Sequence, residues 1–396
     1  MRSTVHDFVE TITNTVNRER LLETAIALVE VPSPTRSAAK VADRLDTLLR
    51  SDGFEVERPD CDWPESPAVV ARMNSGDGGR VLQVDGHLDT VHLKFVPPRV
   101  EDGILYGSGC SDMKGGIAAA VEAMRVVGEC GALTSGGMLL TAHDHHEGPW
   151  GDSRQMKALI SQGYLGDGVM LPEYLADFLP VAGRGMFIFE ISVTRDGDPV
   201  HEVLRPIGQP DVVAAAAELV SLFHQENSRL SEITHPYSGC DSFFVGLMRG
   251  GEIFNQSATS CEVKGTRRWV TPGHADVATE EFNAILQKVA GMTGAAVTSE
   301  EVFPGDAFEV DAGNPLVKAF QHAHEDVTGA VLPLGAKPFV DDGNTYATVG
   351  GIPALTHGPA ATGAHTLNEQ VPIDELVRLA KVYALTAINF CNADCD

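Results

Sequence analysis

The chain carries five side chains of the types that bind divalent metal ions, each within a distinctive motif. They are His87 in GHLDT, Asp112 in GSGCSDMKGG, Glu147 in HDHHEGPWG, Glu173 in LPEY and His365 in GPAATGAHTLNE. Two imidazoles and three carboxylates suit two ions that lie close together, with one carboxylate bridging and each ion taking one His and one further carboxylate. Such a centre makes a hydroxide nucleophile near neutral pH and polarises the bond that it attacks. These residue types therefore predict metal-dependent hydrolysis.

The segments around these residues alternate between strand and helix patterns. Apolar or alternating runs at 68–73, 80–87 and 137–144 predict strands, and residues 115–127 predict a buried helix. Strand–helix–strand alternation with apolar strands predicts a mostly parallel α/β sheet. The candidate ligands fall just after these strands or in the loops that follow. Ligand sites in open α/β sheets lie at the carboxyl ends of strands, so the predicted fold places them together.

The pattern changes near residue 183. RGMFIFEISVTRDG predicts an alternating strand, residues 210–226 predict an amphipathic helix, and two strands and a second helix follow. This β-α-β-β-α order predicts a small α+β domain with an antiparallel sheet. The α/β pattern then returns. We therefore expect a discontinuous metal-binding catalytic domain, 1–182 and 299–396, interrupted by an inserted domain at 183–298.

The composition narrows the choice of partners and location. Asp and Glu number 55 against 29 Lys and Arg, a net charge of −26, and no basic run is visible, which argues against nucleic acid as a partner. Such acidity would not attract an anionic substrate, so a pocket for a carboxylate needs local arginines. The N-terminal residues lack the apolar core of a signal peptide, and no apolar run approaches the roughly 20 residues that span a bilayer. We expect a cytoplasmic protein without a membrane partner.

The motifs GHLDTV and SGCSDMKGGIAA, in this order, make the chain similar to the M20 family of metallopeptidases and amidohydrolases. That family includes acetylornithine deacetylase, succinyl-diaminopimelate desuccinylase, aminoacylase and glutamate carboxypeptidases. The resemblance covers nearly the whole chain. It implies that His87 and Glu173 hold one metal ion, that Glu147 and His365 hold the other, and that Asp112 bridges them. It also implies a cis peptide bond after Asp112.

The resemblance assigns further roles by position. Asp89 would orient a metal-binding imidazole, and the inserted domain would serve as a lid that forms a homodimer or a larger homo-oligomer. His201, in DPVHEVLRP, would reach the partner's active site and stabilise the developing oxyanion, and Asn255 would lie near the substrate. Arg267 and Arg268 cover the position of an arginine that clamps a substrate carboxylate. The sequence does not decide which of the two faces the substrate.

The chain departs from the family at one catalytic position. The family usually shows DEE before a glycine, with the first Glu of the pair as general base. Here His145, His146 and Glu147 stand in those places, so Glu147 keeps the ligand position and His146 takes that of the base. An imidazole can act as a base, since its reference pKa of about 6.5 lies near working pH. Alternatively His146 binds a metal ion or contacts substrate, or a shift of one residue gives the role to His145. Asp144 could orient either ring.

These observations predict a hydrolase with two sites for divalent ions. Zinc, manganese and cobalt are the candidate metals, and one or both sites are expected to be occupied. The expected reaction is hydrolysis of a carbon–nitrogen bond in a small molecule that carries a carboxylate, with N-acyl amino acid deacylation as the default. His146 leaves open an aminohydrolase that releases ammonia from an activated aminobenzoate such as a nitroanthranilate. A non-catalytic metal-binding or ligand-binding member of the fold is a third alternative, which retention of all five ligands disfavours.

Overall fold

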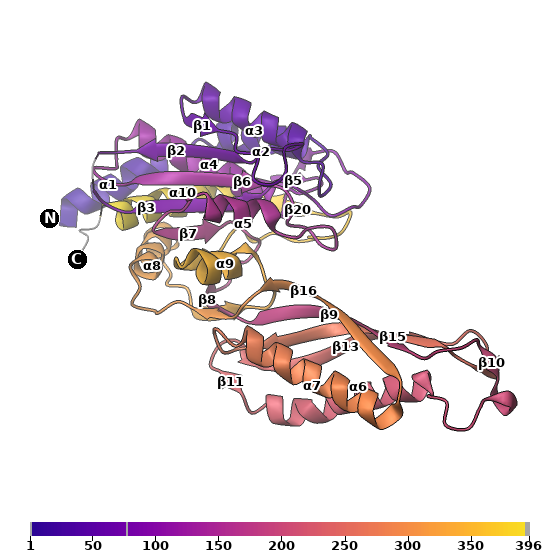
Figure 1. Ribbon diagram of the computed structural model, residues 1–396. Coiled ribbons are helices and arrows are strands. Elements are labelled where there is room, and N and C mark those ends of the chain that lie inside the picture. The colour runs from indigo at the N-terminus through magenta and orange to yellow at the C-terminus, as the bar shows by residue number, and fades with distance from the viewer. Residues whose placement is uncertain (1, 77, 393–396) are drawn as a thin grey trace. The chain divides into compact units, whose positions relative to one another are not determined.

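A computed structural model describes residues 2–76 and 78–392 and divides into two compact units (Figure 1). The first unit comprises Met1–Val181, Val310–Gly335 and Thr345–Asp396, and the second comprises Ala182–Glu309 and Ala336–Asn344. The boundary expected after residue 298 falls inside β16 (Ala296–Gly305). Because β16 pairs with β9 (Gly185–Thr194) on both sides of that point, residues 299–309 belong to the second unit.

The first unit is built on a six-stranded sheet of order β1-β2-β6-β3-β7-β19. The strands are β1 (Glu55–Glu57), β2 (Val69–Asn74), β3 (Val81–His87), β6 (Gly137–His143), β7 (Gly168–Leu171) and β19 (Ala354–Thr356). Neighbours from β6 to β19 run parallel, and β1 and β2 are antiparallel additions at one edge. The central strands are buried on both faces, which explains their continuous apolar character. The predicted mostly parallel α/β sheet is confirmed.

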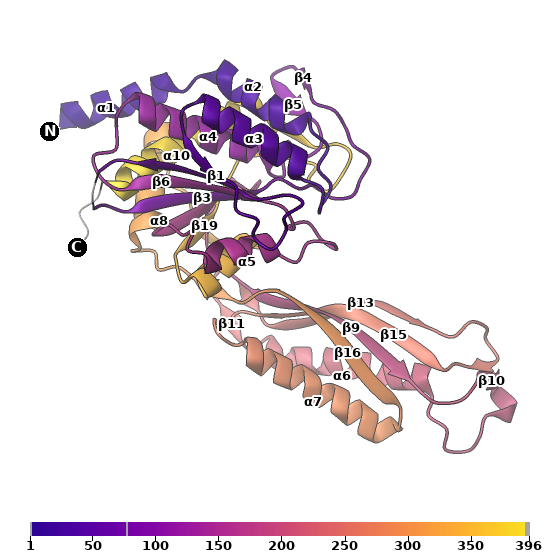
Figure 2. The ribbon, with the colours of Figure 1, turned by 45° about the horizontal axis from the view of Figure 1, so that its top comes forward.

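Helices cover both faces of this sheet (Figure 2). On one face lie α4 (Lys114–Glu129) and α10 (Ile373–Cys391), against which α2 (Arg18–Val29) and α8 (Pro315–Thr328) pack. The elements packed at the periphery or on the other face are α1 (Arg2–Thr15), α3 (Ala39–Ser51), α5 (Arg154–Ser161) and a π-helical turn (Tyr346–Gly350) that follows α9 (Asp342–Thr345). A small sheet joins β20 (Gln370–Pro372), β5 (Ile104–Tyr106) and β4 (Arg99–Glu101).

A buried polar network lies on the α5 side of the sheet. The Asp85 carboxylate accepts hydrogen bonds from the hydroxyls of Thr141 and Tyr346 and lies 3.2 Å from His143 Nε2. The Gln83 amide donates to Thr141 Oγ1 at 2.9 Å and to the Tyr346 hydroxyl at 3.1 Å. Buried polar groups require such partners. The network ties β3, β6 and the π-helical turn together. Its Asp85 lies two residues before His87 on β3.

The second unit is an antiparallel sheet with two helices on one face. Its strand order is β13-β15-β9-β16, with β13 (Ser242–Gly250) and β15 (Ser260–Trp269), and its helices are α6 (Val212–Leu230) and α7 (Ala275–Thr293). Phe187, Phe189, Phe223 and Phe282 form an aromatic core between sheet and helices. The remaining short elements are β8 (Leu179–Gly183), β10 (Val200–His201), η1 (Glu202–Leu204), β11 (Thr234–His235), β12 (Gly239–Cys240), β14 (Gln256–Ser257), β17 (Phe308–Glu309) and β18 (Leu334–Lys337).

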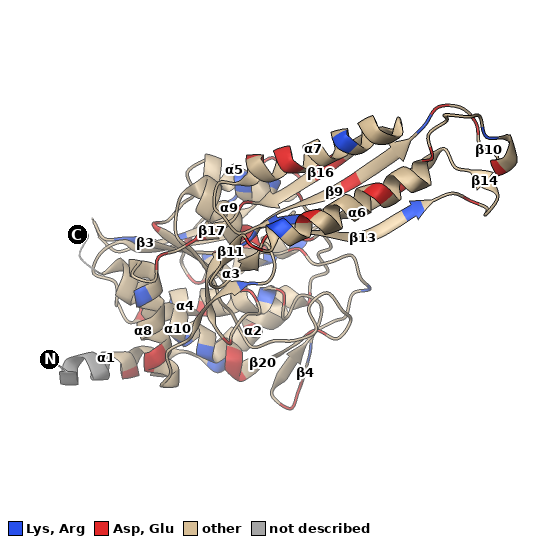
Figure 3. Cartoon of the chain, turned by 90° about the horizontal axis from the view of Figure 1, so that it is seen from below, with Lys and Arg blue, Asp and Glu red and all other residues tan. Residues whose placement is uncertain are grey.

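Charges of both signs are distributed over both units, and no continuous band of Lys and Arg is visible among the described residues (Figure 3). Within the same part of the chain, no helix combines the length and apolar character that crossing a membrane requires.

Glu122 should be the main polar contributor to stability in the helical layer. It is fully buried in α4 and accepts hydrogen bonds from the Asn17 backbone N–H at 2.8 Å and from Arg20 Nε at 2.9 Å, with Arg125 3.5 Å away. We expect Glu122→Ala to lower the free energy of unfolding by about 3 kcal/mol, because it leaves buried donors unpaired. Glu129→Ala is the matched control, since Glu129 also binds Arg20 but is half-exposed, and it should cost about 1 kcal/mol or less. Denaturant unfolding of both variants tests this, and equal losses would contradict it.

Candidate metal centre

The first unit brings all five candidate ligands together at the carboxyl ends of β3, β6 and β7. His87 ends β3, and its Nε2 lies 3.1 Å from Asp112 Oδ1 and 3.8 Å from Glu173 Oε1. The Nε2 atom of His365 lies 3.2 Å from Asp112 Oδ2 and 3.2 Å from Glu147 Oε2. The two oxygens of Asp112 therefore face different imidazoles. The peptide bond between Asp112 and Met113 is cis, as expected.

The site concentrates negative charge in a buried place. His87 is fully buried, and Asp112, Glu147 and Glu173 are at most 5% exposed. Burial lowers the pKa of His87, but the nearby Asp112 and Asp89 carboxylates outweigh it and raise that pKa to about 9. Hydrogen bonds to Asp112 and Glu147 raise the pKa of His365 to about 10. The carboxylates thus favour the protonated, positively charged forms of His87 and His365.

The donor set fits divalent metal ions. The groups His87–Asp112–Glu147 and His87–His146–Glu173 each offer ligand atoms within 4.8 Å of one another among the described residues. Imidazole nitrogens and carboxylate oxygens suit zinc and related transition metals. The Nδ1–H of His87 donates to the Asp89 carbonyl at 2.9 Å, which leaves Nε2 directed at the carboxylates. A cation in this cluster would replace the protons that the imidazoles otherwise hold.

His146 lies at the edge of the cluster. Its ring is stacked on that of His87, with centroids 4.0 Å apart and planes at 3°, and its Nε2 lies 4.0 Å from Glu173 Oε1. The side chain is 19% exposed. The ring is therefore placed to contact a metal ion, a water molecule or a substrate, and its backbone N–H donates to the Asp89 carboxylate at 3.3 Å.

His145 and Asp144 make contacts outside the cluster of candidate ligands. The His145 ring is buried edge-on against Trp63, with Nδ1 3.3 Å from Asp152 Oδ1, so it belongs to a different cluster. Burial lowers the pKa of His145. The Asp144 carboxylate accepts the backbone N–H groups of Arg36 at 2.8 Å, of Ala38 at 3.0 Å and of His145 at 2.6 Å. It thereby holds the loop between α2 and α3 against the loop that follows β6.

Asp89 acts through two different groups. Its backbone carbonyl accepts from His87 Nδ1 at 2.9 Å, whereas its carboxylate lies 3.7 Å from that nitrogen. The carboxylate instead accepts the backbone N–H of Glu147 at 2.9 Å, in addition to that of His146. Asp89 thus fixes the loop that carries Glu147, while its main chain fixes the imidazole.

Two features that the sequence reading did not assign hold the ligand loops. The Glu369 carboxylate accepts the Gly109 backbone N–H at 2.9 Å and the Ser111 hydroxyl at 2.8 Å, so it anchors the loop before Asp112. The signal was an acidic residue four positions after His365. A Cβ on Gly358 would lie 2.0 Å from the Glu173 carbonyl oxygen, so only glycine lets the chain pass so close.

The segment Ser33–Arg36 clasps the loops after β3 and β6. Ser33 Oγ donates to the Leu88 carbonyl at 2.8 Å, the Thr35 N–H donates to the Thr90 carbonyl at 3.1 Å, and the Thr90 N–H donates to the Ser33 carbonyl at 2.8 Å. Thr35 Oγ1 also donates to the Glu147 carbonyl at 3.3 Å. This segment is therefore a clamp on the loops that carry the candidate ligands.

The two arginines of the second unit differ in their surroundings. Arg267 is buried, and its guanidinium binds Asp241 Oδ2 at 3.0 Å and Glu281 Oε2 at 2.9 Å and lies over the Phe243 ring. Arg267 is thus engaged within its own unit. Arg268 has a buried NH1 without a hydrogen-bond partner among the described residues, and burial and nearby Arg184 lower its pKa.

His201 and Asn255 lie together at an exposed end of the second unit. His201 Nε2 is 3.1 Å from Asn255 Nδ2, and the His201 side chain is 47% exposed. Nearby in the chain are five large apolar side chains that are at least 60% exposed: Val203, Leu204, Ile207, Ile253 and Phe254.

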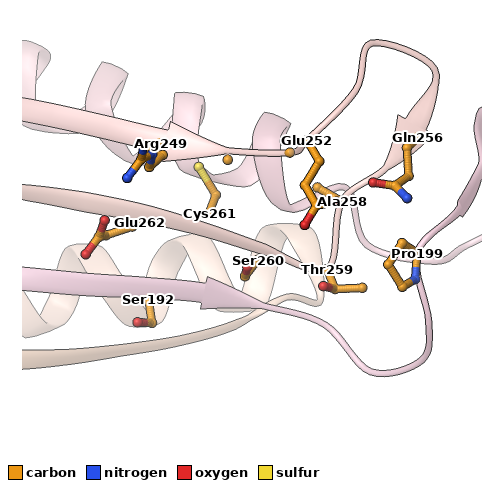
Figure 4. Close-up of a pocket in the computed structure, with 12 residues that line it drawn as sticks. Ser192, Pro199, Arg249, Glu252, Gln256, Ala258, Thr259, Ser260, Cys261 and Glu262 are labelled. Carbon is orange, nitrogen blue, oxygen red and sulfur yellow. The ribbon is translucent and has the colours of Figure 1, made fainter.

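A pocket of about 360 Å³ lies beside this end of the unit, lined by Arg249, Glu252, Gln256 and Glu262 among others (Figure 4). It contains none of the candidate metal ligands.

Comparisons with known proteins identify the family of the chain. A family model described as peptidase family M20/M25/M40 matches residues 84–389. A succinyl-diaminopimelate desuccinylase from Alkalilimnicola ehrlichii is 29% identical over 381 residues, covering 91% of this chain and 96% of the relative. An N-formyl-4-amino-5-aminomethyl-2-methylpyrimidine deformylase from Bacillus subtilis is 23% identical and covers 95% and 96%.

Solved structures of low identity share the fold. A tripeptidase from Staphylococcus aureus superposes with a TM-score of 0.80 at 22% identity, covering 96% of this chain and 99% of that one. A dinuclear metal-binding peptidase of the M20 family from Bacillus subtilis has a TM-score of 0.68 at 14% identity, with coverage of 94% and 97%. The family match spans more than half of the chain and includes all five candidate ligands. The chain therefore belongs to peptidase family M20/M25/M40 and is a metal-dependent hydrolase of carbon–nitrogen bonds.

Proposed function

We propose that this hydrolase removes an acyl group from the nitrogen of a small molecule that carries a carboxylate. His87 and Glu173 would hold one divalent ion, Glu147 and His365 the other, and Asp112 both. The observation that carries the proposal is the arrangement of Asp112, whose Oδ1 faces His87 and whose Oδ2 faces His365 at nearly equal distances. A carboxylate with one oxygen toward each of two ligand sets is suited to bridge two ions.

The reaction class follows from the relatives together with the site. Two relatives that cover most of the chain are named for removing a succinyl and a formyl group. Ions held at the centre would activate a water molecule and polarise the bond under attack. His146, stacked on His87 at the edge of the cluster, would carry a proton between the water molecule and the departing nitrogen. The Asp89 carboxylate would hold Glu147 and His146 in position by accepting their backbone N–H groups.

The second unit would supply recognition of the substrate carboxylate. Arg268 is the arginine we propose for this role, because its NH1 is buried without a hydrogen-bond partner among the described residues, whereas Arg267 is bound by two carboxylates. A guanidinium presents its donors in a planar fork that matches a carboxylate. Local positive charge is needed here, since the chain as a whole is strongly acidic.

We further propose a homodimer in which His201 and Asn255 of one copy serve the metal centre of the other. The support is the exposed His201–Asn255 pair and the five exposed apolar side chains near it in the chain. Clustered exposed apolar side chains of this size mark interaction sites. In the proposed complex, His201 would donate a hydrogen bond to the oxygen that gains negative charge.

A panel of N-acyl amino acids tests the reaction directly. Purified protein loaded with zinc, manganese or cobalt is incubated with N-succinyl, N-formyl and N-acetyl amino acids, and free amine, carboxylate and ammonia are measured separately. Release of amine and carboxylate in equal amounts supports deacylation. Ammonia from an aminobenzoate, with no deacylation of any panel member, would indicate an aminohydrolase instead.

Loss of the bridging carboxylate should empty the centre. We expect Asp112→Asn to lower bound metal, measured by elemental analysis, and to reduce turnover by more than about a hundredfold, because both ions lose a ligand. Asp374→Asn is the control, since Asp374 is 88% exposed and lies outside the cluster. Full metal content with normal turnover in Asp112→Asn would rule out the bridging role.

His146 should matter for proton transfer and not for metal retention. We expect His146→Ala to keep its metal and to lose about a hundredfold or more in turnover. In the wild-type protein the rate should fall as pH drops through the pKa of this imidazole, because protonation removes the lone pair that accepts the proton. That limb of the profile should vanish in the variant. If metal content falls together with turnover, His146 is a ligand.

Complementation tests the shared site. His201→Ala and His365→Ala homodimers should each be nearly inactive. Mixed dimers of the two should recover part of the activity, because one of their two sites combines an intact centre with an intact His201. Subunit exchange is verified with differently tagged copies. Exchange without recovery would contradict the proposed placement of His201.

A further inference from the structure

An exposed aromatic stack lies on the loops that carry the metal ligands. The rings of His92 and Trp150 are stacked, with centroids 3.8 Å apart and planes at 16°. Trp150 is 39% exposed although the imidazole covers one of its faces. The other two tryptophans differ: Trp269 is buried in the second unit, and Trp63 packs against His145. Exposure of so large a ring leaves apolar surface in water, which a bound ligand could cover.

The stack is anchored close to the centre. His92 is five residues after His87, and Trp150 is three residues after Glu147. The Gly151 backbone N–H donates to the Glu147 carbonyl at 2.7 Å and closes a tight turn around Trp150. Three residues of chain span at most about 11 Å, and a turn spans less, so Trp150 lies within reach of a substrate held at Glu147.

The clasp segment holds both rings in place. His92 Nε2 donates to the Thr35 carbonyl at 3.0 Å, and Arg36 Nε donates to the Trp150 carbonyl at 3.1 Å. Thr35 also holds the Glu147 carbonyl. The residues that position the ligand loops thus position the stack too. A rigid aromatic surface loses little conformational entropy on binding, which favours recognition of a flat partner.

We propose that His92 and Trp150 form a subsite for a planar aromatic group of the substrate. This rests on the proposed hydrolysis of an N-acyl bond, and it narrows the substrate class to molecules with an aromatic ring on the acyl or the amine side. A ring stacked on Trp150 gains a specific aromatic contact beyond the burial of its area. An aliphatic group of the same size does not gain this contribution.

Binding and turnover of matched pairs test the proposal. The pairs are N-benzoylglycine with N-acetylglycine, and N-acetylphenylalanine with N-acetylalanine. Binding to metal-loaded protein is measured by calorimetry and by Trp fluorescence. We expect at least one aromatic member to bind more tightly and to shift the fluorescence. In Trp150→Ala, the preference for that member, in Kd and in kcat/KM, should fall about five- to tenfold, while values for the aliphatic partner change little.

Three further variants separate stacking from folding. Trp150→Phe should keep most of the preference, because a phenyl ring also stacks, and His92→Ala should weaken it by loosening Trp150. Tyr237→Ala, which removes an equally exposed ring from the second unit, should change nothing. A preference that is absent in wild type, or unchanged in Trp150→Ala, overturns the inference. Absence of hydrolysis with a Trp150-dependent binding preference would overturn the proposed function and leave the subsite standing.

Discussion

The structure depends on one electrostatic constraint, the gathering of buried carboxylates at the carboxyl edge of the parallel sheet. Asp112, Glu147 and Glu173 lie within a few ångströms of two imidazoles and are almost hidden from solvent. Uncompensated buried charge is costly, and the raised pKa values of His87 and His365 show how strongly the site demands positive charge. Divalent cations satisfy this demand more fully than protons, which explains why the ligand set and the hydrolytic chemistry belong together.

A second group of carboxylates holds the ligand loops without binding the cluster. Asp89, Asp144 and Glu369 each accept backbone N–H groups from loops that carry or flank ligands. Carboxylate acceptors make stronger hydrogen bonds than neutral ones, so three side chains can fix long loops that have no regular structure. The Ser33–Arg36 clasp adds main-chain contacts to the same loops. Precision at the centre thus comes from the surrounding acids as much as from the strands.

Two aromatic contacts lie on the loops that carry candidate ligands. The His146 ring stacks on that of His87 and so places a flat ring beside this candidate ligand. His92 and Trp150 place a second aromatic stack on the neighbouring loops. Both features rest on the same clamped backbone.

The sequence by itself determined the fold class and the candidate ligands, because strand–helix periodicity and two specific motifs are local properties of the chain. It placed the candidate ligands just after predicted strands or in the loops that follow, and the structure has His87 at the end of β3 and Glu147 in the loop after β6. It also identified the inserted antiparallel unit. The predicted end of the inserted unit, after residue 298, falls inside β16. The extent of β16 is set by its pairing with β9, which lies about a hundred residues earlier in the chain, and no local pattern records that pairing.

Only the tertiary structure decided what each polar group contacts. Arg267 and Arg268 are neighbours in one strand, yet side chains alternate along a strand, so one meets Asp241 and Glu281 and the other does not. Asp144 and Asp89 bind backbone N–H groups of segments that are 50 to 110 residues away in the chain, a choice that no local pattern records. Long-range hydrogen bonds depend on how loops fold back on one another, and that is fixed by packing and not by spacing.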